Sequence, residues 1–246
     1  MGAGISLRLA VSAINEGDVA QHSLGRVHPT LDEEQALWSV GYGRVAGVDE
    51  AGRGAWAGPV VAAAVVLPPN AGIALRLAGV ADSKQLAARQ REFLVAVVLA
   101  EAAGSGVGIV SATEIDAYGI AEANRLAMKL AIEALALPPD YLLIDYLRLT
   151  SLSTPQHSLP KGDSRVLSIA AASIVAKVTR DRLMVELAQE HPGYGFERHK
   201  GYGTVDHRAS LMRLGPCPIQ RRSFEPMKSL QPAPSDENQL ALGAPA

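Results

Sequence analysis

Two short apolar segments of this chain end in acidic residues. Residues 45–50 read Val-Ala-Gly-Val-Asp-Glu, and residues 141–145 read Tyr-Leu-Leu-Ile-Asp. Short, nearly continuous apolar runs are typical of strands that are buried on both faces of a sheet. A carboxylate at the end of such a strand is costly unless it is protonated, paired with a cation or bound to a metal ion. The two segments therefore predict a buried sheet with acidic groups along one end.

The other segments predict an α/β protein with a mixed sheet. Residues 60–67 form a second apolar run, and residues 107–111 suggest a third strand. Apolar residues at helical spacing predict a helix over residues 120–135. A longer helix is expected to run to residue 190, with Ser168 as its N-cap. Early strands followed by alternating helix and strand favour a mixed sheet flanked by helices.

Length and composition favour a globular chain of one or two domains. It has 246 residues, of which 48% are hydrophobic and 20% charged. Its apolar runs are far shorter than the roughly 20 residues of a membrane-spanning helix, and its single cysteine excludes an intrachain disulfide. We expect a cytoplasmic protein without membrane association. We divide the chain into an N-terminal extension, an α/β domain, a small C-terminal helical segment and a disordered tail: residues 1–26, 27–192, 193–228 and 229–246.

Four acids are candidates for binding metal ions. Asp49, Glu50 and Asp145 end the two apolar segments, and Asp163 follows Lys161-Gly162. Carboxylates without a cysteine cluster or a His-x-x-x-His pair favour Mg²⁺ or Mn²⁺ over zinc, and two such ions can drive phosphodiester cleavage. Successive strand residues point to opposite faces, so Asp49 and Glu50 face one ion only if the chain bends after them. Helix capping and salt bridges are the alternative roles for these acids.

Other polar residues leave two interpretations open. Gly52-Arg53-Gly54 is either a tight turn or a loop that admits a phosphate, and Asp82-Ser83-Lys84 is either a phosphate contact or a helix cap. Tyr202 is either a packed aromatic residue or a ligand contact. Arg180 and Arg182 on the long helix are expected to be solvated or paired with acids, with phosphate contact as the alternative.

A series of motifs resembles the ribonuclease HII family, which is the type 2 ribonuclease H family. The resemblance extends over residues 27–228 and rests on Asp49-Glu50-Ala51-Gly52-Arg53-Gly54, Gly58-Pro59-Val60, Asp82-Ser83-Lys84, Leu143-Ile144-Asp145, Lys161-Gly162-Asp163, residues 170–181, residues 199–204 and Ser223-Phe224-Glu225-Pro226. It implies an RNase H-like fold, with a mixed five-stranded sheet flanked by helices and a small C-terminal helical segment for substrate binding.

The resemblance also implies an activity. It is that of a metal-dependent endonuclease that cuts the RNA strand of RNA/DNA hybrids and cuts 5′ to single ribonucleotides in duplex DNA. Such an enzyme would serve DNA replication and ribonucleotide excision repair. Two Mn²⁺ or Mg²⁺ ions would be the cofactors, and the products would carry 3′-hydroxyl and 5′-phosphate ends.

The resemblance further assigns roles to individual residues. Asp49, Glu50, Asp145 and Asp163 would bind the metal ions. Gly52, Arg53 and Gly54 would contact the backbone and the 2′-hydroxyl around the ribonucleotide, Lys84 a phosphate, and Tyr202 the neighbouring sugar. Two positions depart from the family pattern. Arg221-Arg222 stands where the family usually has His-Arg before Ser-Phe, and Tyr146 stands where the family often has glycine after the third acid. The turn after Asp145 is therefore expected to differ in shape.

Two other functions remain as alternatives. One is a non-catalytic module that binds hybrids, and the other is a different two-metal nuclease of the same superfamily, such as an enzyme specific for DNA. The formal net charge of -2 excludes only a uniformly basic protein, since residues 195–222 carry six Lys or Arg against two acids. We expect a monomer that binds nucleic acid. Gln239-Leu240-Ala241-Leu242 is a weak candidate motif for a sliding clamp.

Overall fold

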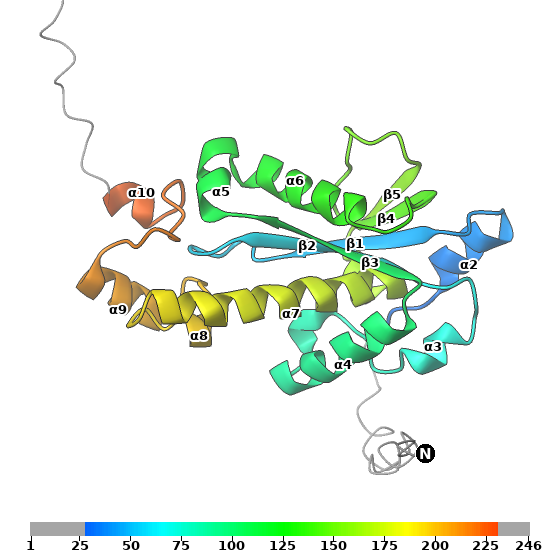
Figure 1. Cartoon of the computed structure of the whole chain (residues 1–246), viewed down its shortest axis with the longest axis horizontal. Helices are drawn as coiled ribbons and strands as arrows, with labels where there is room; N and C mark the ends of the chain where they lie inside the picture. The colour runs from blue at the N-terminus through cyan, green and yellow to red at the C-terminus, as the bar shows by residue number, and fades with distance from the viewer. Residues whose placement is uncertain (1–27, 231–246) are drawn as a thin grey trace, which may run out of the picture.

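A five-stranded sheet runs through the middle of the computed structural model, which describes residues 28–230 (Figure 1). The strand order is β3-β2-β1-β4-β5. β1 pairs with β2, and β2 with β3, in antiparallel fashion, whereas β4 is parallel to β1 and β5 is parallel to β4. The predicted mixed sheet is confirmed. The strand bounds are β1 Val45–Ala51, β2 Val60–Val66, β3 Gly104–Val110, β4 Tyr141–Asp145 and β5 Gln156–Leu159.

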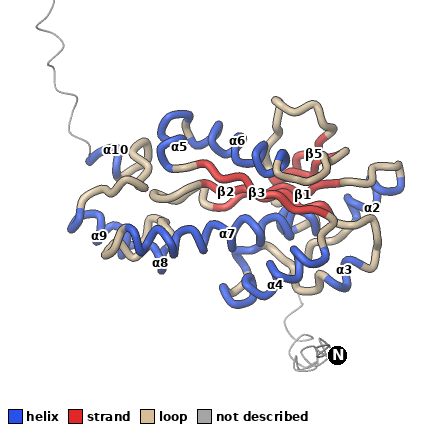
Figure 2. Tube along the Cα trace, in the orientation of Figure 1, coloured by secondary structure: helices blue, strands red, loops and turns tan. Residues whose placement is uncertain are grey.

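Helices cover both faces of this sheet (Figures 1 and 2). One face packs against α5 (Ala112–Tyr118) and α6 (Ile120–Glu133), and the other against α3 (Ile73–Arg76), α4 (Ala88–Glu101) and α7 (Leu167–Glu190). Two apolar clusters fill the space on either side of the strands. Because both faces are covered, β2 is buried throughout, and β1 and β4 are buried except at Glu50, Tyr141 and Asp145, which are partly exposed.

The alternation of side chains along β1 decides which layer each residue meets. Ala46 and Val48 pack in the cluster on the α6 face, whereas Ala51 packs in the cluster on the α7 face. Gly47 also faces α7, and a Cβ atom at this position would lie 2.2 Å from the backbone carbon of Ser168. The long helix therefore rests directly on the backbone of β1.

Two predicted boundaries were wrong. The third strand covers Gly104–Val110 and not residues 107–111, and Ser111 is the N-cap of α5, where its hydroxyl accepts a hydrogen bond from the N–H of Glu114. The long helix begins one residue before Ser168. The N–H of Ser168 donates instead to the buried carboxylate of Glu34, at 2.7 Å. A distant acid thus replaces the predicted local cap.

Short elements complete the structure around the sheet. α2 (Asp32–Ser39) precedes β1, and two 3-10 turns, η2 (Ser83–Gln85) and η3 (Gly162–Ser164), lie between the longer elements. α8 (Phe196–His199), α9 (Val205–Leu214) and α10 (Met227–Leu230) gather near one end of the molecule, on the left in Figure 1. Within residues 28–230, no helix combines the length and apolarity needed to cross a membrane.

Candidate active site

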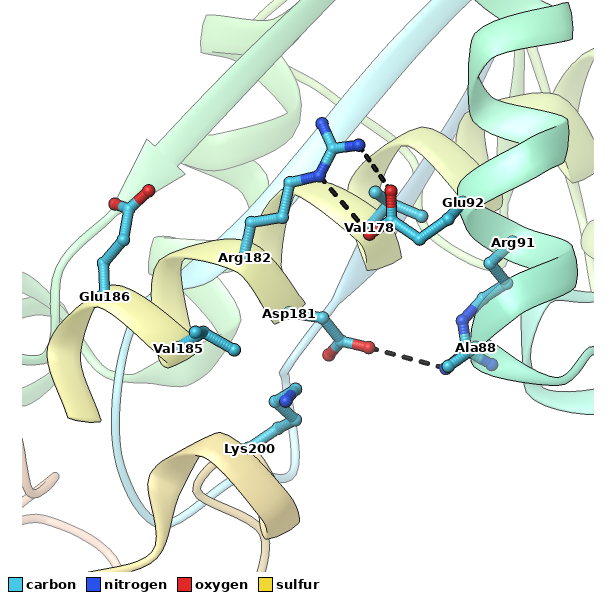
Figure 3. Close-up of a pocket in the computed structure, with 9 residues that line it drawn as sticks. All are labelled: Ala88, Arg91, Glu92, Val178, Asp181, Arg182, Val185, Glu186 and Lys200. Carbon is cyan, nitrogen blue, oxygen red and sulfur yellow. Dashed lines mark hydrogen bonds and ion pairs between the residues drawn. The ribbon is translucent and has the colours of Figure 1, made fainter. Parts of the chain in front are cut away.

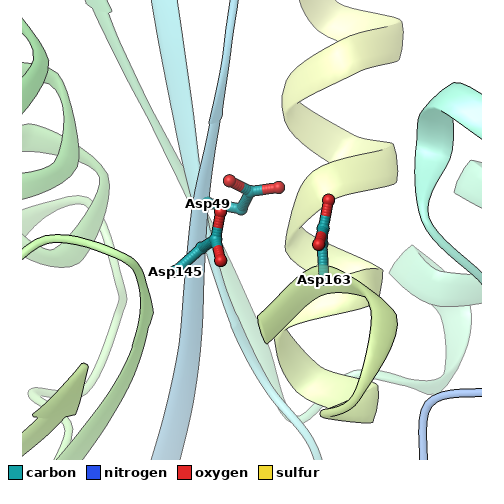
Figure 4. A group of neighbouring side chains, drawn as sticks. All are labelled: Asp49, Asp145 and Asp163. Atoms are coloured by element: carbon teal, nitrogen blue, oxygen red, sulfur yellow. The ribbon is translucent and has the colours of Figure 1, made fainter. Parts of the chain in front are cut away.

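Three of the four predicted acids form a compact group (Figure 4). Asp49, Asp145 and Asp163 each offer a carboxylate oxygen, and these oxygens all lie within 4.8 Å of one another. Asp49 and Asp163 are buried, with exposed fractions of 3% and 5%. Three oxygen ligands at this spacing suit a hard divalent cation.

The fold explains why these acids meet. β1 and β4 are parallel neighbours, with Val48 beside Ile144. The next residues along these strands, Asp49 and Asp145, therefore lie side by side. Asp145 follows the same face as Leu143, which packs against Ile169 of α7. Asp163 comes from η3, the turn just before α7. The N–H of Gly162 in this turn donates to Asp145 Oδ1 at 2.7 Å, which joins the third acid to the fourth.

Glu50 does not join this group. β1 stays regular through Ala51, with Asp49 paired to Ala63 and Glu50 to Ala62, so the bend that would turn both acids to one side is absent from this strand. Glu50 consequently shares the face of Ala46 and Val48, opposite that of Asp49.

Burial and mutual repulsion oppose ionisation of the group. Burial raises the pKa of Asp49 well above its usual value, and the charges of Glu50 and Asp145 raise it further. The pKa of Asp145 is also raised, mainly by burial, although the Gly162 hydrogen bond opposes this. Burial and the charge of Asp145 likewise raise the pKa of Glu50. Such a site is electrostatically incomplete without a cation.

Lys84 supplies part of the missing positive charge. Its Nζ lies 3.3 Å from Asp163 Oδ2, and its side chain remains 74% exposed. Burial alone would lower the pKa of Lys84, but the charge of Asp163 and two further acids raises it overall. The helix-cap interpretation of this motif is also confirmed, because the Asp82 side chain accepts a hydrogen bond from the N–H of Lys84.

The Gly-Arg-Gly turn (residues 52–54) follows β1 directly. It closes with a hydrogen bond from the N–H of Ala55 to the carbonyl of Gly52, at 3.2 Å. Gly52 has φ +91°, and a Cβ atom there would lie 1.8 Å from Arg180 Nε. No contact inside the protein requires a glycine at position 54. Nothing lies within 4 Å of the place where a Cβ atom would stand, and the φ of Gly54 is not positive. The open space beside Gly54 lets a ligand approach the backbone.

Tyr202 and the Gly-Arg-Gly turn both lie against Arg180. Its ring centroid is 5.2 Å from the guanidinium carbon of Arg180 and 5.4 Å from Lys177 Nζ. Because Arg180 also lies beneath Gly52, the structure brings Tyr202 and the Gly-Arg-Gly turn together.

The prediction for Arg180 was wrong, whereas that for Arg182 is confirmed. Arg182 is exposed and pairs with Glu92. Arg180 is fully buried, and its three hydrogen bonds go to backbone carbonyls instead of water or an acid. The sequence offers a partial signal for this, since Ala176 and Val178 just before Arg180 are apolar.

Tyr146 keeps a backbone conformation that favours glycine. Its φ is +60°, in the left-handed region, and its side chain is 65% exposed. The N–H of Tyr146 donates to the carbonyl of Leu159 at 3.1 Å. Tyrosine therefore adopts, at some cost in strain, a conformation that glycine adopts more readily.

A cavity of about 340 Å³ lies elsewhere, between α4 and α7 (Figure 3). Asp49, Asp145 and Asp163 do not line it. Its charged residues largely neutralise one another, since Arg91 pairs with Asp181 and Arg182 with Glu92. This arrangement favours a structural role for the cavity wall.

Sequence reasoning missed the burial and the contacts of two polar residues near the site. Arg221 is fully buried and donates to the carbonyls of Gly52 and Arg53 in the Gly-Arg-Gly turn. Asn124 of α6 is also fully buried, and it lies close enough to Glu50 to lower the pKa of that acid. No hydrogen bond of good geometry joins them, and both polar side-chain atoms of Asn124 lack a partner within the described part of the chain. The only sequence signal for Asn124 is a polar residue within an otherwise apolar helix face.

Comparison with known proteins identifies relatives over most of the chain. The family model for ribonuclease HII matches residues 46–227. The ribonuclease HII of Chloroflexus aurantiacus is 55% identical over 203 residues, which cover 81% of this chain and 94% of the relative. That of Dehalococcoides mccartyi is 49% identical over 207 residues, which cover 82% and 95%.

Solved structures agree with this relationship. The ribonuclease H2 of Pyrococcus horikoshii aligns with a TM-score of 0.65 and 30% identity, over 76% of this chain and 96% of the other. The ribonuclease HII of Archaeoglobus fulgidus, solved as a complex with PCNA, aligns with a TM-score of 0.62 and 26% identity, over 74% and 95%. This chain belongs to the ribonuclease HII family and is a ribonuclease H endonuclease.

Proposed function

We propose that this enzyme cuts the RNA strand of RNA/DNA hybrids and also cuts 5′ to single ribonucleotides embedded in duplex DNA. The products would carry 3′-hydroxyl and 5′-phosphate ends. The observation that carries the proposal is the group formed by Asp49, Asp145 and Asp163, with oxygens within 4.8 Å of one another, on the same strand end as an open Gly-Arg-Gly turn. Replication and ribonucleotide excision repair are the processes that require such cuts.

The acids suit two divalent ions, Mn²⁺ or Mg²⁺. Asp49, Asp145 and Asp163 would hold them. Glu50 lies on the opposite face of β1 and would join the set only if the end of the strand turned its side chain toward the other three. When bound, the ions would activate a water molecule and stabilise the departing 3′-oxygen. Carboxylates held apart from water, with raised pKa values, are stabilised in their charged form by such ions.

Recognition of the ribonucleotide would come from the residues around the Gly-Arg-Gly turn. The 2′-hydroxyl distinguishes RNA from DNA at a single position, and the backbone of the glycine-rich turn can reach it without a steric cost. Arg53 is exposed at the turn and would contact the nucleic-acid backbone. Lys84 would bind a phosphate, and Tyr202 would pack against the sugar beside the ribonucleotide.

A cleavage assay on three substrates tests the proposal. The substrates are a duplex with one ribonucleotide, an RNA/DNA hybrid and an all-DNA duplex, each with Mg²⁺ or Mn²⁺. We expect cleavage of the first two only, with no cleavage by D49N and unchanged cleavage by E186Q, which removes an exposed carboxylate of α7. Equal cleavage of the all-DNA duplex would indicate a nuclease of other specificity. Binding without products would indicate a non-catalytic module.

We also propose a sliding clamp as partner. The relative from Archaeoglobus fulgidus was solved in complex with PCNA, and Gln239-Leu240-Ala241-Leu242 is the candidate motif in this chain. These residues lie outside the described part of the structure. Clamp binding should weaken on deletion of residues 229–246, and an unchanged affinity would eliminate this motif. Light scattering of the full chain tests whether it is a monomer.

A further inference from the structure

Two arginines lie buried beneath the Gly-Arg-Gly turn without an acidic partner. Arg180 and Arg221 both have an exposed fraction of 0%. Among residues 28–230, no carboxylate lies within ion-pair distance of either guanidinium. A buried charge is usually paired, because its removal from water is costly. Here two like charges are neighbours, and Asp116 and Asp181 offset them only from beyond ion-pair distance.

The hydrogen bonds of the two arginines all go to backbone carbonyls. Arg221 donates to Gly52 at 2.8 Å, to Arg53 at 2.9 Å and to Gly58 at 3.0 Å. The guanidinium of Arg180 donates to the carbonyls that follow the turn and precede Tyr202: Ala57 at 3.1 Å, Pro59 at 2.9 Å and Lys200 at 3.0 Å. The pair therefore fixes the segment from Gly52 to Pro59 from the inside.

This arrangement sets the direction of two amide groups. In a trans peptide the C=O and N–H groups point in opposite directions. Since the carbonyls of Gly52 and Arg53 point inward to Arg221, the N–H groups of Arg53 and Gly54 point outward. Neither N–H has a hydrogen-bond partner within the described residues, and both residues are exposed. Two successive outward N–H groups form a concavity that binds anions.

We propose that Arg221, supported by Arg180, is a positioning residue that orients the amides of Arg53 and Gly54 toward a phosphate of the RNA-containing strand. That phosphate adds a negative charge near two arginines that no described acid approaches within ion-pair distance. This inference rests on the proposed function, and it adds the reason why the turn is ready for substrate before binding. Burial, and then the charge of Arg180, lower the pKa of Arg221 to about 9, which still leaves it protonated at neutral pH.

Kinetics of R221K in the full-length enzyme test the role of Arg221. Lysine keeps the charge but cannot span three carbonyls. We expect KM for the single-ribonucleotide duplex to rise about tenfold or more while kcat stays within about threefold, since hydrogen bonds from charged groups are worth that much. The control is R44K, because Arg44 also holds a backbone carbonyl, that of Pro138, but precedes β1. A variant with lower thermal stability and unchanged KM would show a purely structural role and overturn the proposal.

A binding measurement separates this inference from the proposed activity. Inorganic phosphate is titrated into wild type and R221K, and the amide signals of Arg53 and Gly54 are followed by NMR. We expect both signals to shift in wild type and to shift much less in R221K. If the two amide signals of wild type do not shift, the inference fails, whatever the cleavage assays give. This outcome needs only wild type, so it can be read even if R221K does not fold. If the amides shift but RNA is not cut, the proposed function fails and the orienting role stands.

Discussion

Asp49→Asn is predicted to stabilise the metal-free protein although it abolishes cleavage. The carboxylate of Asp49 is buried, and oxygens of Asp145 and Asp163 lie within 4.8 Å of it. At that separation and an effective dielectric constant of about 20, Coulomb's law gives a repulsion of about 3.5 kcal/mol for each ionised pair. Partial protonation and the ammonium group of Lys84 reduce this figure. We expect a net gain of about 2 kcal/mol, equivalent to a Tm higher by about 4–8 °C.

Asparagine is the appropriate replacement because it preserves the local hydrogen bond. The N–H of Glu50 donates to Asp49 Oδ1 at 2.7 Å, and an amide oxygen can accept the same bond. The substitution therefore removes the charge with little change in shape.

The assay is thermal unfolding in a chelator over a range of pH. The pKa of Asp49 is raised in the folded state, so the folded state binds more protons than the unfolded state at intermediate pH. The stability that wild type gains by holding a proton on Asp49 is fully present at pH values below the pKa of this group in the unfolded chain. It is lost as the pH rises through the higher pKa of Asp49 in the folded protein. The Tm advantage of D49N should thus increase with pH, and added Mn²⁺ should stabilise wild type more than the variant. The control, E186Q, should leave Tm nearly unchanged. An advantage that is absent, or independent of pH, would refute the repulsion argument.

Four further predictions concern backbone positions. Gly52→Ala should destabilise the fold by about 3 kcal/mol because its methyl group would meet Arg180 at a positive φ. Gly54→Ala should leave unfolding by denaturant unchanged and lower cleavage of RNA-containing duplexes, since only a ligand needs that space. Tyr146→Gly should raise the free energy of unfolding by between zero and about 1 kcal/mol, because the relief of strain is offset by the greater entropy of glycine in the unfolded chain. A clear loss of stability in denaturant unfolding would contradict the strain at φ +60°. Gly47→Ala should cost about 3 kcal/mol by separating α7 from β1, and a change below about 0.5 kcal/mol would refute this close contact.

The strands that carry the acids could be predicted because local runs of apolar residues indicate that these strands are buried. β5 could not, since Gln-His-Ser-Leu lies at the sheet edge and lacks such a run. The N-cap of α7 and the burial of Arg180 depend on partners far along the chain, namely Glu34 and the carbonyls of Ala57 and Pro59. Local patterns carry no information about such partners.

The meeting of three acids was predictable from their strand ends and from the family motifs. The separation of Glu50 from them was also foreseeable, since a regular strand alternates its side chains. What the sequence left open was whether β1 bends, and the pairing of Glu50 with Ala62 shows that it does not. Arg221 was unpredictable because its acceptors are carbonyls, which every residue has.

The contact of α7 with Gly47 has a consequence for how the metal site can evolve. Asp49 stands on β1 two residues after Gly47, and Asp163 stands on the turn that leads into α7. The distance between these carboxylates is therefore set by how closely helix and strand approach, and that approach is limited by backbone atoms instead of interlocking side chains. A core substitution that moves the helix by a fraction of an ångström would change which ion fits the site while every acid stays in place. Ion preference in this enzyme is thus open to selection through residues that never contact the ion.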